Sequence, residues 1–346
     1  MLTMHEPLRI AVFGTKSYDR IYLDSANTAF KHQLTYFEPR LDETTVTLAA
    51  GFPAVCVFVN DSLNDAVLTE LRKAGTRIVA LRCAGYNNVD LRAAGRLGIV
   101  IVRVPAYSPN AVAEFTVGLI LALNRNIPRA WARVRENNFA LDGLVGHNLF
   151  GRTIGVIGTG RIGALVARTF GEGFGCEVVA SDLVPDKALI AAGVRYLDTK
   201  ELLAQADIIT LHCPLTPLTH HIINADSIAR ARPGVMIVNT SRGALIDTEA
   251  LIGGLKSHKI GSVALDVYEQ EADLFFEDLS NEIIGDDIFQ RLLTFPNVLI
   301  TGHQAFLTEE ALTAIARTTL QSITDAASGK PLEFRIGAEF DADVDD

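Results

Sequence analysis

The sequence predicts two α/β domains of Rossmann or flavodoxin type, each a doubly wound parallel sheet, with one domain inserted into the other. Short runs rich in β-branched and apolar residues alternate with longer amphipathic segments, as in parallel sheets that are covered by helices on both faces. This alternation occurs in two successive series, and a single helical segment follows the second. At 346 residues the chain is long enough for two domains with separate cores.

The first series occupies about the first hundred residues. A helical stretch from Ala111 to Asn124 follows it, and then a less regular segment that carries Trp131. The predicted strands of this series are RIAVFG, LTYFE, AVCVFV, RIVALRC and VIVRVP.

The second series begins at Thr153. Its predicted strands are TIGVIG, EVVASD, DIITLHC, VMIVNT, SVALDV and NVLIT. The segment that follows, LTEEALTAIARTTLQSITDAASGK, has a helical period and is ended by Gly329.

We expect the final helix to return to the first series. The first domain then comprises residues 1–106 and 303–346 and is discontinuous, the second comprises residues 107–302, and residues 339–346 form a disordered acidic tail. Two crossings between domains give two hinge points, and clefts between such domains are common places for small ligands.

Composition excludes several classes of function. The formal charge is −10, from 41 acidic and 31 basic residues, which is unfavourable for a nucleic-acid partner. The longest apolar run, Phe115 to Leu123, is far shorter than the roughly 20 residues that a bilayer requires. Four scattered cysteines and an N-terminus without a signal-peptide pattern favour the reducing cytoplasm, and no spacing suggests a metal site.

A glycine motif predicts a dinucleotide site. TIGVIGTGRIG places Gly158, Gly160 and Gly163 in a GxGxxG pattern directly after a predicted strand. These glycines allow a tight turn, close approach of a pyrophosphate and close packing of helix on strand. Asp182 ends the next strand, at about the 20-residue spacing where a carboxylate binds the ribose hydroxyls and repels a 2′-phosphate. The predicted cofactor is therefore NAD rather than NADP.

Three charged side chains follow three successive strands of the second series. Arg242 follows VMIVNT, Glu271 follows SVALDV and His303 follows NVLIT. Reduction of a 2-oxo acid requires a cation for the carboxylate and a proton donor for the carbonyl oxygen, and arginine and histidine suit these tasks. A carboxylate beside the histidine orients its ring and favours its charged form. Each residue alone also has a structural interpretation, as a surface charge or a helix cap.

The motifs VIGTGRIG, LHCPLTPLT, MIVNTSRGALID, ALDVYEQE and GHQAF, taken together, resemble the NAD-dependent D-2-hydroxyacid dehydrogenases, and GHQAF with VPAYSPNAVAEF resembles the D-lactate dehydrogenase branch of that family. The resemblance covers nearly the whole chain in the family's order. It implies Arg242 as substrate anchor, His303 as acid/base and Glu271 as its partner, five residues after Asp266.

The resemblance also implies binding residues. For the substrate, a small 2-oxo or D-2-hydroxy acid, it adds Ala84, Gly85, Tyr107 and Phe306. For the cofactor it adds the residues Arg161, Ile162, His212, Pro214, Thr240 and Asp266. Asp266, Tyr107 and Phe306 each have a structural alternative, at a strand end or in a core.

Several alternatives stay open at this point. The substrate is pyruvate, or a larger, branched or aromatic 2-oxo acid, or glyoxylate or hydroxypyruvate. A protein of another class, an NAD-sensing corepressor of the same fold, would use the acidic segment 269–287, with Phe275 and Phe276, as a docking surface. A homodimer through the stretch from Ala111 to Trp131 is expected, with a tetramer left open.

Overall fold

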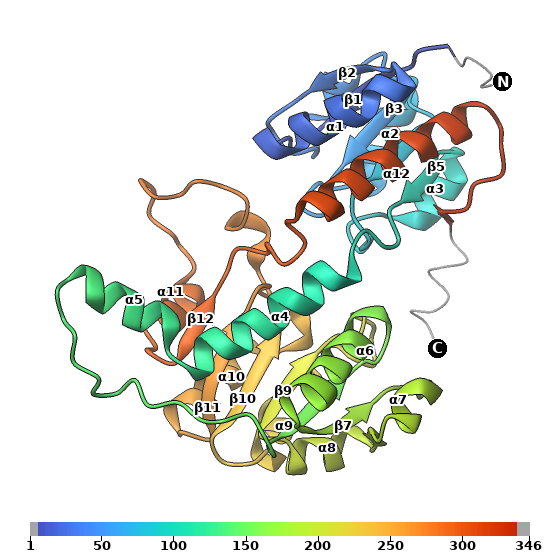
Figure 1. The fold of residues 1–346 in the computed structure, drawn as a ribbon. Helices are drawn as coiled ribbons and strands as arrows, with labels where there is room; N and C mark the ends of the chain where they lie inside the picture. Colours follow the sequence, from blue (N-terminus) through green and yellow to red (C-terminus); the bar gives the residue numbers. More distant parts are fainter. Residues whose placement is uncertain (1–5, 338–346) are drawn as a thin grey trace. The chain divides into compact units, whose positions relative to one another are not determined.

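The computed structural model describes residues 6–337, and the chain divides into two compact units (Figure 1). Unit 1 comprises Met1–Ser108 and Leu307–Asp346, and unit 2 comprises Pro109–Phe306. The chain thus passes from one unit to the other twice, within four residues of each expected boundary. The predicted acidic tail, residues 339–346, lies outside the described residues.

Unit 1 is built on a six-stranded sheet in the order β13-β5-β4-β3-β1-β2. Strands β1 to β5 are parallel, as expected, and β13 pairs antiparallel with β5. Every residue of β3 and β4 is buried, because apolar clusters cover both faces of the sheet. The elements are β1 (Arg9–Val12), α1 (Ser17–Phe30), β2 (Gln33–Tyr36), a 3₁₀ helix (Val46–Ala49), β3 (Ala54–Val57), α2 (Asp65–Lys73), β4 (Ile78–Leu81), α3 (Leu91–Leu97), β5 (Val100–Arg103), α12 (Glu309–Ala327) and β13 (Arg335–Ile336).

Unit 2 carries a seven-stranded parallel sheet in the order β12-β11-β10-β9-β6-β7-β8. The order reverses between β6 and β9, which is the crevice where doubly wound sheets bind dinucleotides. The elements are α4 (Pro109–Asn124), α5 (Ile127–Arg135), β6 (Thr153–Ile157), α6 (Arg161–Arg168), a π turn (Thr169–Gly173), β7 (Glu177–Ser181), α7 (Lys187–Ala191), β8 (Arg195–Tyr196), α8 (Thr199–Gln205), β9 (Ile208–Leu211), α9 (Ala225–Arg230), β10 (Val235–Asn239), a 3₁₀ helix (Gly243–Leu245), α10 (Thr248–Lys256), β11 (Ile260–Leu265), a 3₁₀ helix (Glu271–Asp273), α11 (Asp287–Leu293) and β12 (Val298–Ile300).

Side chains just before the helices determine where several helices begin. Asn64, Asp90, Asp247 and Thr308 each accept a hydrogen bond from a first-turn amide of the helix that follows. The final helix, α12, ends as the sequence predicts, because Gly329 adopts a left-handed backbone with a φ of +65°. No helix among residues 6–337 combines the length and the apolar character needed to span a membrane.

The expectation of an irregular segment around Trp131 is wrong, because this segment is helix α5. Ile127, Trp131 and Val134 follow a helical period, but they form an apolar stripe that stays exposed, and no residue of α5 is buried. The two-residue strands β8 and β13 also escape prediction, since they are too short to show an alternating pattern.

Candidate active site

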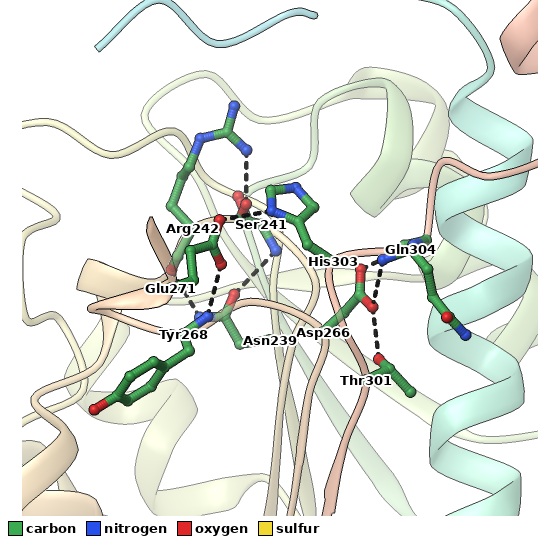
Figure 2. A network of polar contacts seen from close by, with 10 residues as sticks. Asn239, Ser241, Arg242, Asp266, Tyr268, Glu271, Thr301, His303 and Gln304 are labelled. Atoms are coloured by element: carbon green, nitrogen blue, oxygen red, sulfur yellow. Dashed lines mark hydrogen bonds and ion pairs between the residues drawn. The ribbon is translucent and has the colours of Figure 1, made fainter. Parts of the chain in front are cut away.

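The sheet of unit 2 brings the three charged residues together. Strands β10, β11 and β12 are neighbours, and the segments after their carboxyl ends carry Arg242, Glu271 and His303. Figure 2 shows these side chains gathered at one place, where polar contacts join the loops after β11 and β12, while the contacts of Arg242 stay within its own loop. All three residues belong to unit 2, so their arrangement is set by one sheet.

His303 and Glu271 form a hydrogen-bonded pair. The imidazole Nδ1 lies 2.7 Å from Glu271 Oε1, and each side chain is 17% exposed. The other carboxylate oxygen, Oε2, accepts a hydrogen bond of 2.9 Å from the amide of Tyr268. Because an ionised carboxylate only accepts, Nδ1 carries a proton and donates it to Glu271. This fixes the orientation of the ring and leaves Nε2 for a reactant.

Asp266 holds the loop that carries His303. Its carboxylate is fully buried and accepts hydrogen bonds from Thr301 Oγ1 (2.6 Å) and from the amides of Gln304 (2.9 Å) and Ala305 (2.8 Å). Its carbonyl oxygen accepts a bond of 2.7 Å from the His303 amide. Burial raises the pKa of Asp266, opposed by these hydrogen bonds. These contacts hold His303 in a left-handed backbone with a φ of +53°.

Phe276 is a neighbour of the histidine that the sequence did not reveal. Its ring centroid lies 5.6 Å from that of the His303 imidazole, and its backbone also has a positive φ, +69°. The adjacent Phe275 is only 6% exposed and packs against Phe289 in the core of unit 2. The interpretation of both phenylalanines as a docking surface is therefore wrong for Phe275, which is not accessible to a partner.

Arg242 is positioned by the end of β10. The fully buried Asn239 donates a hydrogen bond of 2.8 Å from Nδ2 to the Arg242 carbonyl and accepts one of 3.0 Å from the Ser241 amide. The Arg242 guanidinium donates to the Ser241 carbonyl over 2.7 Å. The next residue, Gly243, packs closely against the Tyr268 carbonyl group, which a Cβ at this position would overlap. Asn239 is the last residue of the buried strand β10, and its role was not apparent from the sequence.

The glycine motif forms the turn between β6 and α6. Gly158 has a φ of +90°, and a Cβ on it would overlap the Cys213 nitrogen. A Cβ on Gly163 would overlap the Gly158 carbonyl oxygen. At Gly160, just before α6, a Cβ would meet no atom of the described chain within 4 Å. The turn therefore leaves open space at the helix N-terminus, where Arg161 and Ile162 begin α6, and it fits a pyrophosphate.

Asp182 lies directly after β7, beside the glycine turn. Its Oδ2 accepts hydrogen bonds from the Thr159 amide (2.5 Å) and hydroxyl (3.1 Å). Tyr196 in turn donates to the Thr159 hydroxyl over 2.8 Å. Thr159 and Tyr196 were not predicted from the sequence, since the glycine pattern leaves its second position open.

The other residues implied for the cofactor lie around the same strand ends. His212 follows β9, and its Nε2 lies 2.9 Å from Thr210 Oγ1. Desolvation lowers the pKa of His212 to about 3, so the ring is neutral. Thr240, after β10, is buried and shares a hydrogen bond of 2.8 Å with Thr116 of α4. Pro214 is exposed, and its carbonyl accepts from the Thr219 hydroxyl.

The residues implied for the substrate are divided between the units. Ala84 and Gly85 follow β4 of unit 1, and Tyr107 is half-buried close to the end of its first segment. Phe306 ends unit 2 and is 6% exposed. The roles of these four residues stay predictions.

Comparison with known proteins agrees with this geometry. Residues 117–305 match the family model described as D-isomer specific 2-hydroxyacid dehydrogenase, NAD binding domain. A 2-hydroxyacid dehydrogenase homolog of Haemophilus influenzae is 55% identical over 326 residues, which are 94% of this chain and 98% of that protein. The D-lactate dehydrogenase of Escherichia coli is 52% identical over 323 residues, with 93% and 98% covered.

Solved structures show the same relationship. An apo structure of D-lactate dehydrogenase from Escherichia coli has a TM-score of 0.86 and 48% identity, covering 95% of this chain and 100% of the other. D-lactate dehydrogenase from Aquifex aeolicus, complexed with NAD and lactic acid, has a TM-score of 0.82 and 31% identity, covering 92% and 96%. The two-domain α/β fold, NAD as the cofactor and the oxidoreductase class predicted from the sequence are thereby confirmed, and the chain belongs to the NAD-dependent D-2-hydroxyacid dehydrogenase family.

Proposed function

We propose that this protein is a D-lactate dehydrogenase that reversibly reduces pyruvate with NADH. The observation that carries the proposal is the His303–Glu271 hydrogen bond of 2.7 Å, which leaves the other ring nitrogen for a reactant at the strand ends where Arg242 also lies. Two relatives named D-lactate dehydrogenase support the choice of substrate.

Each member of the trio has a separate task. The Arg242 guanidinium binds the pyruvate carboxylate with two parallel hydrogen bonds and stays charged throughout. NADH, when bound at the glycine turn, supplies the hydride to C2. As negative charge develops on the carbonyl oxygen, protonated His303 donates its Nε2 proton to that oxygen, and Glu271 stabilises the imidazolium before this transfer. In lactate oxidation, His303 accepts the proton instead.

The main alternative keeps this mechanism and changes the substrate. Relatives such as the Haemophilus influenzae protein are named only 2-hydroxyacid dehydrogenase homologs, and a longer 2-oxo acid would use the same three residues. We test this by measuring kcat/KM with NADH for pyruvate, phenylpyruvate, hydroxypyruvate and glyoxylate. We expect the highest value for pyruvate, and a value at least tenfold higher for another acid would contradict the proposal.

The corepressor alternative is tested in the same assay. Binding of NADH without turnover of any of the four acids would favour it. We expect turnover, and the hydrogen bond between His303 and Glu271 supports this expectation.

We further propose that the protein forms homodimers. The expected interface is the stretch from Ala111 to Trp131, but Ala111, Leu119 and Ile120 in α4 are buried, so we place the contact on α5 and the segment that follows it. Trp131, Phe139, Leu141, Val145 and Phe150 are between 63% and 86% exposed, which is unusual for large apolar side chains close together in sequence. Light scattering after size exclusion should give a mass twice the chain mass of 37.4 kDa. The Trp131→Glu variant should give a lower measured mass, because the dimer dissociates. A cytoplasmic location is also proposed, since none of the four cysteines forms a disulfide.

A further inference from the structure

A second cluster of ionisable side chains lies outside the catalytic trio. His220 and His221 belong to the loop after β9, and Glu269 follows β11. Among the described residues, these three each offer one ligand atom, and the three atoms lie within 4.8 Å of one another. All three belong to unit 2.

The backbone places both histidines on the same side of the loop. Consecutive side chains of an extended chain point in opposite directions, but His221 has a left-handed backbone with a φ of +51°. Its amide donates to the Ala244 carbonyl over 2.9 Å, and its carbonyl accepts from Asn224 Nδ2 over 2.8 Å. As a result the imidazoles of His220 and His221 stack, with ring centroids 3.9 Å apart. Two stacked imidazoles repel each other when both are protonated, whereas one cation can bind both.

Glu269 is held with one oxygen facing the histidines. Its Oε2 accepts hydrogen bonds from the Thr248 hydroxyl (2.9 Å) and amide (3.3 Å). Thr248 is buried and is the first residue of α10, so this support is rigid. Glu269 Oε1 lies 2.6 Å from His221 Nε2. Outer partners of this kind orient carboxylate ligands in metal sites.

We propose that His220, His221 and Glu269 bind one divalent transition-metal ion of the zinc class. Two imidazole nitrogens and one carboxylate oxygen suit Zn²⁺ or Co²⁺, whereas Ca²⁺ and Mg²⁺ prefer oxygen ligands alone. Zn–N and Zn–O bonds of about 2.0–2.2 Å require His221 and Glu269 to separate only slightly, with the cation replacing their shared proton. His220 is exposed, which leaves the fourth position of a tetrahedral site to water.

The site would connect two loops of unit 2. His220 and His221 lie in the loop after β9, and Glu269 is adjacent to Tyr268, whose amide donates to the catalytic partner Glu271. Metal binding is measured directly, so its test does not depend on the proposed reaction.

The experiment measures binding of Zn²⁺ and Co²⁺ to the chelator-treated full chain. Calorimetry should show one Zn²⁺ per chain, and Co²⁺ should give visible d–d absorption typical of four or five ligands. His221→Ala and Glu269→Gln should abolish both signals. Thr248→Val should weaken binding by about 10-fold, as loss of an outer partner does. His258→Ala is the matched control, because His258 of unit 2 is exposed like His220 and has a left-handed backbone like His221. Metal binding by this variant should be unchanged.

Two further variants remove competing explanations. His303→Ala and Cys176→Ser should both bind Co²⁺ as the wild type does, which excludes the catalytic histidine and the partly exposed thiol as ligands. Circular dichroism confirms that each variant is folded. Binding that survives both His221→Ala and Glu269→Gln would overturn the proposal, as would the absence of saturable binding to the wild type. In either case His221 and Glu269 form only a hydrogen bond between loops.

Discussion

Each unit carries an ion pair that involves a residue just past the carboxyl end of a parallel strand, and the two pairs differ in burial. In unit 1, Arg82 follows β4 and binds Asp19 over 3.1 Å, with side chains 1% and 10% exposed. Its guanidinium also donates to the Gly14 carbonyl over 2.8 Å. In unit 2, His303 follows β12 and binds Glu271 over 2.7 Å, with both side chains 17% exposed.

The difference in burial distinguishes the Arg82–Asp19 pair, which has a structural role, from the His303–Glu271 pair, which can exchange a proton with a reactant. Arg82 is enclosed by its own unit, and its charge is compensated there, so no reactant can use it. The His303–Glu271 pair is partly exposed, and the imidazole keeps one nitrogen for proton exchange. Position at a strand end is therefore insufficient evidence for a catalytic role, and exposure of an atom that can react is the additional requirement.

The largest expected effect is on catalysis. We expect His303→Ala to lower kcat/KM for pyruvate by about 10²- to 10⁴-fold, the usual contribution of general acid catalysis. Its free energy of unfolding should change by no more than about 1 kcal/mol, because the side chain is partly exposed. Steady-state kinetics measures kcat/KM, and urea denaturation of the same preparation measures the free energy of unfolding. Retention of kcat/KM within about threefold would remove His303 from the mechanism.

The unit 1 pair should show the opposite behaviour. Asp19→Ala removes the hydrogen-bonded carboxylate of the buried Arg82 and leaves Asp61 as the other buried carboxylate that interacts with it. We expect a loss of about 3–5 kcal/mol in the free energy of unfolding. Arg96 and Asp65 provide the matched control in the same unit, since they pair at 2.5 Å with side chains 60% and 57% exposed. Asp65→Ala should cost at most about 1 kcal/mol. Equal losses in the two variants would show that burial does not distinguish these pairs.

His212 allows a second comparison within unit 2. Unlike His303, it pairs with no carboxylate in the described chain, and desolvation keeps its imidazole neutral. Its folded pKa of about 3 lies below the ordinary value of 6.5, so its contribution to stability is complete above pH 6.5 and is lost as the pH falls toward 3. Between pH 6 and pH 4, the free energy of unfolding of the wild type should fall by about 2–3 kcal/mol more than that of His212→Gln. Urea denaturation across this range measures the difference, and parallel pH profiles would contradict it.

The glycine turn gives the smallest expected effects. Gly163→Ala places a methyl group against the Gly158 carbonyl and should destabilise the protein by about 1–3 kcal/mol. Gly160→Ala meets no neighbouring atom in the described chain, so stability should hardly change while NADH binding, measured by fluorescence, weakens. Unchanged NADH affinity in Gly160→Ala would argue against the pyrophosphate site.

The sequence predicted the strands of both units except β8 and β13, the glycine turn and the strand ends that carry the three charged residues. These follow from local periodicity and from spacing along the chain. It did not reveal Asn239, Thr159 or Phe276. Thr159 and Phe276 contact residues far apart in the sequence, and Phe276 and His303 also have a left-handed backbone. The contacts of Asn239 are local, but the pattern of a buried strand does not show them. Helix α5 was missed although Ile127, Trp131 and Val134 follow a helical period, and no residue of this helix is buried.

A crystal structure with NAD and oxamate, which mimics pyruvate, tests the central claim most directly. We predict that the Arg242 guanidinium binds the oxamate carboxylate through two bonds of about 2.7–2.9 Å. The Nε2 atom of His303 should lie about 2.6–3.2 Å from the oxygen that takes the place of the pyruvate carbonyl. A separation of more than about 10 Å between the imidazole of His303 and the guanidinium of Arg242 would contradict the mechanism, because no single keto acid could reach both groups.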